Sequence, residues 1–256
     1  MGILIIIISV LIISVKDTLA VKAVNRISRL HGDQLIQNFY PISSKFWLHR
    51  SDSLEKTAEF SDKYNGIELD IIFFNKESDF DVSHDSNGRI DYPLESFLQF
   101  LTGTENKIWL DFKNLNINNA VQSSNLLEEM LSRNHIDKNR VIVESHDYNA
   151  LGYFKNKGFY TSFYCPVDDK YLNTEEGKTL FTSLVLKAVD SGNVNAVSFP
   201  VGYYSLVKST NIKVDFLTWN ENEKWFKFYF NPELQKVLND QQVKVILVKD
   251  SAKVNR

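Results

Sequence analysis

Two acidic residues on one short apolar segment are the first sign of chemistry in this sequence. Glu68 and Asp70 lie within residues 66–72, which read GIELDII. Successive side chains of a strand point to opposite faces, so residues two apart share a face. Burying two unpaired carboxylates is costly, and a divalent cation held between them offsets that cost. The spacing therefore predicts a metal site on a buried strand.

A second segment repeats this spacing with Asp111 and Lys113, in residues 107–113, which read KIWLDFK. Asp111 could supply a third carboxylate to the same site. Oxygen ligands without cysteine favour Mg²⁺ or Ca²⁺ over Zn²⁺. The alternative is an exposed strand face at Glu68 and Asp70 and a local ion pair at Asp111. The apolar neighbours in residues 66–72 favour burial instead.

Further polar side chains stand where other apolar segments end. His49 follows residues 45–48, His84 follows residues 80–83, and Glu144 ends the run VIVE. A lone histidine is often structural. As a set, however, these residues match the C-terminal rim of an α/β barrel, where catalytic side chains collect. Glu144 is expected to contact substrate there.

The segments that must position these residues alternate between two patterns. Short β-branched or aromatic runs predict strands, and the longer segments between them have a helical period. Eight strands are expected at residues 45–48, 66–73, 107–112, 140–144, 159–164, 196–200, 213–219 and 243–249. Seven helices are expected at residues 53–63, 93–101, 118–134, 147–156, 174–190, 202–209 and 231–240. A short strand at residues 80–83 is expected to form a hairpin with the second strand.

Eight strands separated by helices most simply close into an α/β (β/α)8 TIM barrel of a single domain. No repeat, low-complexity tract or Pro/Gly-rich linker divides residues 24–256. An open doubly wound sheet is the structural alternative. The chain has no glycine-rich phosphate loop after its first strand, which disfavours that alternative.

The first 23 residues have a different character. Residues 3–15 are an almost unbroken run of isoleucine, leucine and valine. About 13 residues suit the apolar region of a secretory signal and are short for a membrane-spanning helix. We therefore expect residues 1–23 to be a signal peptide, with a secreted or periplasmic protein as the result. The alternative is an N-terminal membrane anchor through residues 3–15.

Charge and cysteine content narrow the range of partners. The 29 basic and 32 acidic residues give a net charge of −3 without charged blocks, which does not match a nucleic-acid-binding surface. Cys165 is the only cysteine, so neither an intrachain disulfide nor a thiolate cluster can form. Contact with a membrane surface through the aromatic residues 226–230 is possible, although core packing is the favoured interpretation. No feature specifies an oligomeric state.

Taken in order, the motifs resemble a known superfamily. His49-Arg50, Glu68-x-Asp70, His84-Asp85 and Asp111-x-Lys113 are similar to the pattern of glycerophosphodiester phosphodiesterases, sphingomyelinase D-like phospholipases and the related menorin family. The segment LTWN at residues 217–220 looks like the tryptophan-containing seventh strand of the same barrels. The resemblance implies a metal-dependent phosphoric diester hydrolase acting on a phospholipid, lysophospholipid or glycerophosphodiester.

The same resemblance implies roles for individual residues. His49 and His84 would be the acid and base, and Lys113 would bind the phosphate. Arg50 and Trp219 would help to form the substrate pocket. One Mg²⁺ or Ca²⁺ would be held by Glu68, Asp70 and Asp111.

The chain also departs from the glycerophosphodiesterase pattern. That pattern usually has a glycine after His-Arg and a further Pro-Glu-Asn-Thr stretch, whereas residues 51–55 read SDSLE. The resemblance therefore implies phosphodiester chemistry without specifying the head group. The alternative function is a secreted menorin-like binding or signalling protein with no turnover. A glycoside hydrolase that uses the strand-end carboxylates is a more distant alternative.

Overall fold

A closed ring of parallel strands forms the centre of the structure, a computed structural model that describes residues 37, 40–84, 92–220 and 224–250. The expected leader at residues 1–23 and the residues His31 and Asp85 lie outside the described residues. The eight parallel strands are β1 (Phe46–Leu48), β2 (Gly66–Phe74), β4 (Lys107–Phe112), β5 (Val141–Ser145), β6 (Tyr160–Tyr164), β7 (Ala196–Pro200), β8 (Asp215–Trp219) and β9 (Val243–Val248).

The ring closes because β1 pairs in parallel with both β9 and β2. This closure confirms the (β/α)8 barrel and excludes the open doubly wound sheet. The short strand β3 (Asp79–Val82) pairs antiparallel with β2 outside the ring, as expected for the hairpin. All nine predicted strands are present, with ends that differ from the expected ones by at most two residues.

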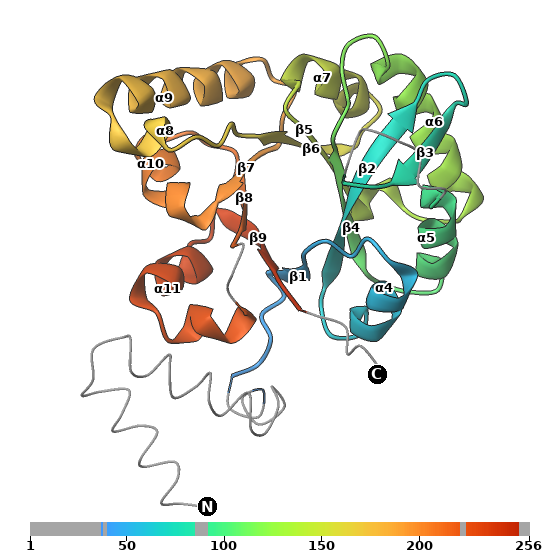
Figure 1. The fold of residues 1–256 in the computed structure, drawn as a ribbon, viewed down its shortest axis with the longest axis horizontal. Helices are drawn as coiled ribbons and strands as arrows, with labels where there is room; N and C mark the ends of the chain where they lie inside the picture. Colours follow the sequence, from blue (N-terminus) through green and yellow to red (C-terminus); the bar gives the residue numbers. More distant parts are fainter. Residues whose placement is uncertain (1–36, 38–39, 85–91, 221–223, 251–256) are drawn as a thin grey trace, which may run out of the picture.

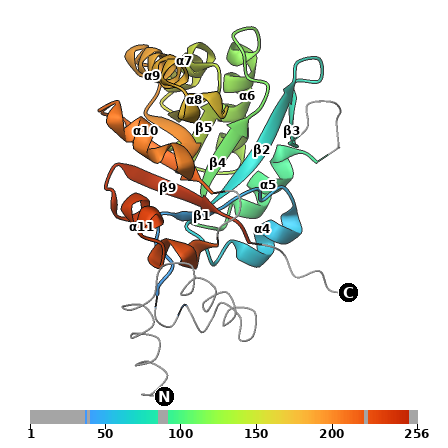
Figure 2. The ribbon, with the colours of Figure 1, turned by 60° about the vertical axis from the view of Figure 1, so that its left-hand side comes forward.

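Helices surround the ring and connect its strands (Figures 1 and 2). They are α4 (Leu54–Phe60), α5 (Leu94–Leu101), α6 (Ala120–Arg133), α7 (Tyr148–Asn156), α8 (Lys170–Asn173), α9 (Glu175–Asp190), α10 (Tyr204–Ser209) and α11 (Pro232–Asn239), with 3-10 turns at Lys138–Arg140, Val201–Tyr203 and Trp225–Tyr229. Two helices begin with a side-chain cap: Asp147 accepts hydrogen bonds from the amides of Asn149 and Ala150, and Thr174 accepts one from the amide of Gly177. None of the helices among the described residues is long and apolar enough to span a membrane.

Two apolar layers stabilise this arrangement. The larger one fills the space between the outer face of the strands and the helices. It includes Phe226 and Phe228, so the aromatic run at residues 226–230 packs into the core as favoured from the sequence. The second layer fills the barrel interior and consists of Trp47, Trp109, Ile142, Ala196, Leu217, Trp219, Val245 and Leu247. Polar side chains of the interior therefore collect above this layer, at the strand C-termini.

Candidate active site

A pocket of about 80 Å³ opens at the C-terminal ends of the barrel strands. Its lining contains all nine residues that the sequence singles out: His49, Arg50, Glu68, Asp70, His84, Asp111, Lys113, Glu144 and Trp219. Trp109, Tyr164 and Leu247 complete the lining. Residues from six separate segments of the chain thus meet in one place.

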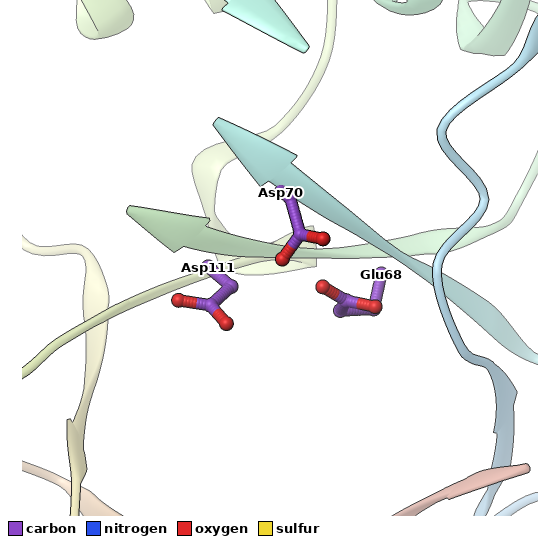
Figure 3. Close-up of side chains that lie close together, drawn as sticks. All are labelled: Glu68, Asp70 and Asp111. Atoms are coloured by element: carbon purple, nitrogen blue, oxygen red, sulfur yellow. The ribbon is translucent and has the colours of Figure 1, made fainter. Parts of the chain in front are cut away.

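Three carboxylates form the centre of the pocket. Glu68 and Asp70 extend from β2 and Asp111 from the neighbouring strand β4, and the three point into the same small space (Figure 3). One oxygen from each lies within 4.8 Å of the other two. Strand register explains the approach, because Asp70 pairs directly with Asp111 across the β2–β4 ladder. The shared face expected for residues two apart on β2 is confirmed.

Because the three carboxylates are largely buried next to one another, keeping all of them ionised costs free energy. Glu68 and Asp70 are about 98% and 99% buried. Burial and the neighbouring charges of Asp70 and Asp52 hold the pKa of Glu68 well above its usual value. Burial also raises the pKa of Asp111, although Lys113 opposes that shift. One buried oxygen of Asp70, Oδ2, has no hydrogen-bond partner among the described residues.

These features fit a divalent cation. The donors are all carboxylate oxygens, which Mg²⁺ and Ca²⁺ prefer. A cation would satisfy the unpartnered Asp70 oxygen and relieve the repulsion among the three acids.

Lys113 supplies positive charge at the edge of the carboxylate cluster. Its ammonium lies 2.5 Å from Asp70 Oδ1 and also pairs with Asp111 Oδ2. Burial by itself would lower the pKa of Lys113, but the attraction of Asp111 and Asp70 outweighs it and raises the pKa above its usual value. Lys113 is therefore a fixed cation beside the carboxylates.

The turn between β1 and α4 connects the first strand to this cluster. Arg50 has a φ of 51°, which is unusual for a residue with a side chain. Its backbone amide donates to Glu68 Oε2 at 2.6 Å. The Lys56 ammonium donates to the carbonyls of His49 and Arg50 at 2.8 and 2.6 Å. A lysine from α4 thus holds the turn that orients Glu68.

His49 lies at the end of β1 and faces Glu68. Its side-chain Nε2 is 3.9 Å from Glu68 Oε2, while its buried Nδ1 has no hydrogen-bond partner among the described residues. Burial, together with the positive charges of Arg50, Lys249, Lys56 and Lys113, lowers the pKa of His49 to about 3. The imidazole is accordingly neutral near pH 7 and can accept a proton.

His84 lines the same pocket and contacts Arg50. The Arg50 Nη2 atom is 3.2 Å from His84 Nε2. A guanidinium has no acceptor atom, so in this contact Nε2 accepts and the ring carries its proton on Nδ1. Arg50 thereby selects one tautomer of His84.

Glu144 and Trp219 line the remaining walls. Glu144 pairs in register with Asp111 on the adjacent strand, so Asp70, Asp111 and Glu144 form a row across β2, β4 and β5. Its Oε2 accepts a hydrogen bond from Ser162 Oγ at 3.3 Å, and burial holds its pKa well above the usual value. The Trp219 ring packs against Tyr164, with centroids 4.9 Å apart.

Asp52 is a neighbour of the site that the sequence did not indicate. Its Oδ1 accepts a hydrogen bond from the Asp70 amide at 3.2 Å. Burial and the nearby charge of Asp70 raise the pKa of Asp52 to about 6. Asp52 falls in the segment that departs from the glycerophosphodiesterase pattern, so no motif identified it. The departure of residues 51–55 from that pattern was the feature of the sequence that could have pointed to Asp52.

The other two histidines among the described residues lie outside the pocket lining. His146 precedes α7, where its ring packs on Tyr164, and His135 is exposed after α6. Cys165 is fully buried.

Comparison with known proteins gives matches by structure. No family model matches the chain, and no curated protein matches it by sequence. A glycerophosphoryl diester phosphodiesterase from Agrobacterium tumefaciens superposes with a TM-score of 0.57 at 13% identity, over 80% of this chain and 92% of the other. An Oleispira antarctica phosphodiesterase in complex with sn-glycerol-3-phosphate gives a TM-score of 0.50 at 12% identity, over 79% and 92%.

The chain has the barrel fold of glycerophosphodiester phosphodiesterases. The resemblance expected from the motifs is therefore confirmed at the level of the fold. A phosphoribosylanthranilate isomerase from Pyrococcus furiosus also superposes, with a TM-score of 0.51 at 13% identity over 81% and 88% of the two chains. Because one fold serves both kinds of enzyme, function must be argued from the site.

Proposed function

We propose that this protein is a metal-dependent phosphoric diester hydrolase. The observation that carries the proposal is the single pocket that contains two histidines, three clustered carboxylates and two cationic side chains at the strand C-termini. Anion-binding cations, a cation-binding acidic cluster and an acid/base pair are the three needs of phosphodiester cleavage. The fold shared with glycerophosphodiester phosphodiesterases supports the same reading.

Glu68, Asp70 and Asp111 would hold one Mg²⁺ or Ca²⁺. That ion would supply charge neutralisation for the bound phosphate. Lys113, which pairs with Asp70 and Asp111, would bind a phosphate oxygen. Arg50, Trp219 and Glu144 would contact the rest of the substrate.

The two histidines divide the proton transfers between them. Neutral His49 takes a proton from the attacking hydroxyl, either water or a hydroxyl of the substrate, as the new P–O bond forms. His84, as an imidazolium, would give its Nδ1 proton to the leaving oxygen as the old P–O bond breaks, and would return to a neutral imidazole. Attack by water yields a monoester and an alcohol, whereas attack by a substrate hydroxyl yields a cyclic phosphate and an alcohol.

The substrates in this proposal are a phospholipid, a lysophospholipid or a glycerophosphodiester, and the proposed setting is outside the cytoplasm. Residues 3–15 support export, and a lipid substrate would bring the strand C-termini to a membrane surface. N-terminal sequencing of the protein recovered from the medium or periplasm tests the export proposal. A protein that begins near residue 24 is expected, and one retained in the cytoplasm with residues 1–23 intact would contradict it.

Histidine variants test the acid/base assignment. His49→Asn and His84→Asn are each expected to lower turnover of a phosphodiester panel by roughly 10²–10⁴-fold. The panel would contain glycerophosphocholine, lysophosphatidylcholine and sphingomyelin, with Mg²⁺ or Ca²⁺ restored after chelation. The matched control is His135→Asn, because His135 is exposed, has a φ of 53° that asparagine tolerates, and lies outside the pocket lining.

The outcome of the panel also decides between the competing functions. No turnover of any member by a protein that binds the metal would favour the binding or signalling barrel. A glycoside hydrolase is disfavoured because its mechanism would give no role to the two histidines of the pocket.

A further inference from the structure

A second and larger cavity opens at the opposite end of the barrel. Its volume is about 310 Å³, and its lining comes from the N-terminal ends of the strands. The apolar floor consists of Trp47, Ile142, Leu217 and Val245, all buried members of the barrel interior. A volume of about 310 Å³ lies at the lower end of the range for small-molecule sites. No residue of this cavity lines the active-site pocket.

Cationic side chains dominate the rim of this N-terminal cavity. Lys107, Arg140 and Lys244 line it together with one acid, Asp215. One oxygen of Asp215 already accepts a hydrogen bond from Tyr160 at 2.7 Å, and the other lies 3.7 Å from Lys244. Among the described residues, neither Lys107 nor Arg140 has an ion-pair partner. The rim therefore carries excess positive charge.

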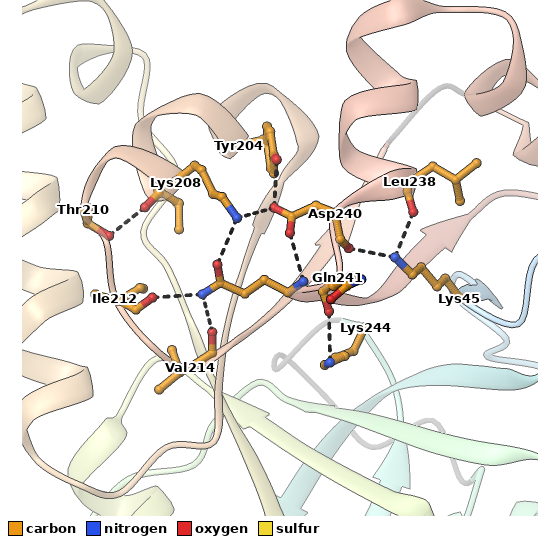
Figure 4. Close-up of polar contacts among 12 residues, drawn as sticks. Lys45, Tyr204, Lys208, Thr210, Ile212, Val214, Leu238, Asp240, Gln241 and Lys244 are labelled. Atoms are coloured by element: carbon orange, nitrogen blue, oxygen red, sulfur yellow. Dashed lines mark hydrogen bonds and ion pairs between the residues drawn. The ribbon is translucent and has the colours of Figure 1, made fainter.

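The rim is held in place by hydrogen bonds. The Arg140 guanidinium donates from Nε and Nη2 to the Asn106 carbonyl, at 3.0 and 2.6 Å. Lys244 donates to the Gln241 carbonyl at 2.9 Å (Figure 4). The adjoining loops are joined by further contacts shown in the same view, including those of Lys45 and Asp240. A preformed rim of this kind reduces the ordering cost of binding.

We propose that the N-terminal cavity binds a small organic carboxylate with a flat apolar body. The apolar floor takes the body, and the cations of the rim take the carboxylate. This site is independent of the proposed phosphodiesterase activity, since it shares no residue with that pocket.

The two ends of the barrel can be distinguished by their tryptophans. Trp47 lines the N-terminal cavity, whereas Trp219 and Trp109 line the active-site pocket. The chain contains four tryptophans, so its indole N–H spectrum is simple to resolve. A ligand bound at one end of the barrel is expected to shift first the indole N–H resonances of the tryptophans that line that end.

The experiment is a titration of the ¹⁵N-labelled full chain with 2-naphthoate, followed by the indole N–H resonances. The Trp47 signal, assigned by its absence in Trp47→Phe or by its contacts with Gly66, is expected to shift and saturate. Neutral 2-naphthamide is expected to bind at least tenfold more weakly. Lys107→Glu should weaken naphthoate binding at least tenfold, whereas Lys187→Glu, an equal charge change on exposed α9, should not.

Three results would overturn the proposal. One is a Trp47 signal that does not move at millimolar naphthoate. Another is a shift confined to Trp109 and Trp219, which would place the ligand at the active-site pocket. The third is equal binding of the amide, or equal binding by Lys107→Glu, since the cationic rim would then have no role.

Discussion

Asp70 is the residue on which the proposed metal site depends most. It lies between Glu68 and Asp111 in the cluster and has the buried oxygen without a partner. Replacing this carboxylate with an amide of the same shape removes one anionic ligand while keeping the backbone pairing of β2 with β4.

We expect Asp70→Asn to weaken binding of Mg²⁺ and Ca²⁺ at least tenfold, measured by isothermal titration calorimetry. The matched control is Asp62→Asn, because Asp62 is exposed and is not part of the cluster. Equal affinity in Asp70→Asn and the unaltered protein would remove Asp70 from the metal site.

Asp52 connects protonation at the site with stability. Its folded-state pKa of about 6 lies above its ordinary value of 3.8, so the folded protein binds a proton more tightly than the unfolded chain does. Protonation of Asp52 therefore adds to the free energy of unfolding. This contribution is fully present below pH 3.8 and is lost as the pH rises through 6, a change of about 3 kcal/mol. Asparagine keeps an oxygen for the Asp70 amide but carries no charge.

Asp52→Asn is therefore expected to be more stable than the unaltered protein at pH 7.5, and to lose that advantage at pH 3.8. Urea unfolding of the metal-free proteins at the two pH values measures the difference. An Asp52→Asn advantage that is the same at both pH values would contradict the raised pKa.

The chemical type of a site residue decides whether it can be recognised in the sequence. Charged groups and histidines stand out within apolar strands, and the eight that were selected line one pocket together with Trp219. Trp109, Tyr164 and Leu247 share the pocket, but an apolar residue on a strand has the same appearance whether it faces a core or a substrate. Lys56 acts on backbone carbonyls of His49 and Arg50, and no spacing rule predicts such a contact.

At the scale of elements, the start of β2 is tightly fitted against β1. A Cβ atom on Gly66 would lie 2.5 Å from Cδ2 of the Trp47 ring, which is far inside contact distance. These two strands also carry Glu68 and His49, each two residues further along. The close approach at Gly66 thus helps to set the distance between the two strands that form the site.

Gly66→Ala is expected to lower the free energy of unfolding by roughly 1–3 kcal/mol, because the Trp47 ring must move. Gly103→Ala is the matched control, since a Cβ there meets nothing within 4 Å. Denaturant unfolding of both variants checks the prediction. Equal free energies of unfolding for Gly66→Ala and Gly103→Ala would contradict the prediction, because they would show that the Trp47 ring moves without cost.

The elements themselves were largely predictable. Alternation of strand-like and helical periods located every strand of the ring and seven of the helices. The four-residue helix α8 and the 3-10 turns are too short to show a period, so the sequence does not predict them. The predicted helix at residues 53–63 is shorter in the structure, where α4 ends at Phe60.

At the scale of the molecule, barrel closure gives the protein two different ends. Interior residues two apart on one strand lie about 7 Å from each other, and they divide between the ends. Trp47 faces the N-terminal cavity and His49 the active-site pocket, and Leu217 and Trp219 divide in the same way. The sequence predicted the C-terminal end because its residues are chemically distinctive, whereas the rim lysines of the N-terminal cavity resemble any surface lysines.

The pocket at the strand C-termini is proposed to perform metal-dependent phosphodiester cleavage. The most direct measurement is ³¹P NMR of glycerophosphocholine and lysophosphatidylcholine incubated with the chelated protein, before and after addition of Mg²⁺ or Ca²⁺. A phosphomonoester or cyclic phosphate signal that grows only with metal, and that fails to grow with His49→Asn, is the predicted result. Product formation that is unaffected by chelation, or equally fast in His49→Asn, would contradict the account.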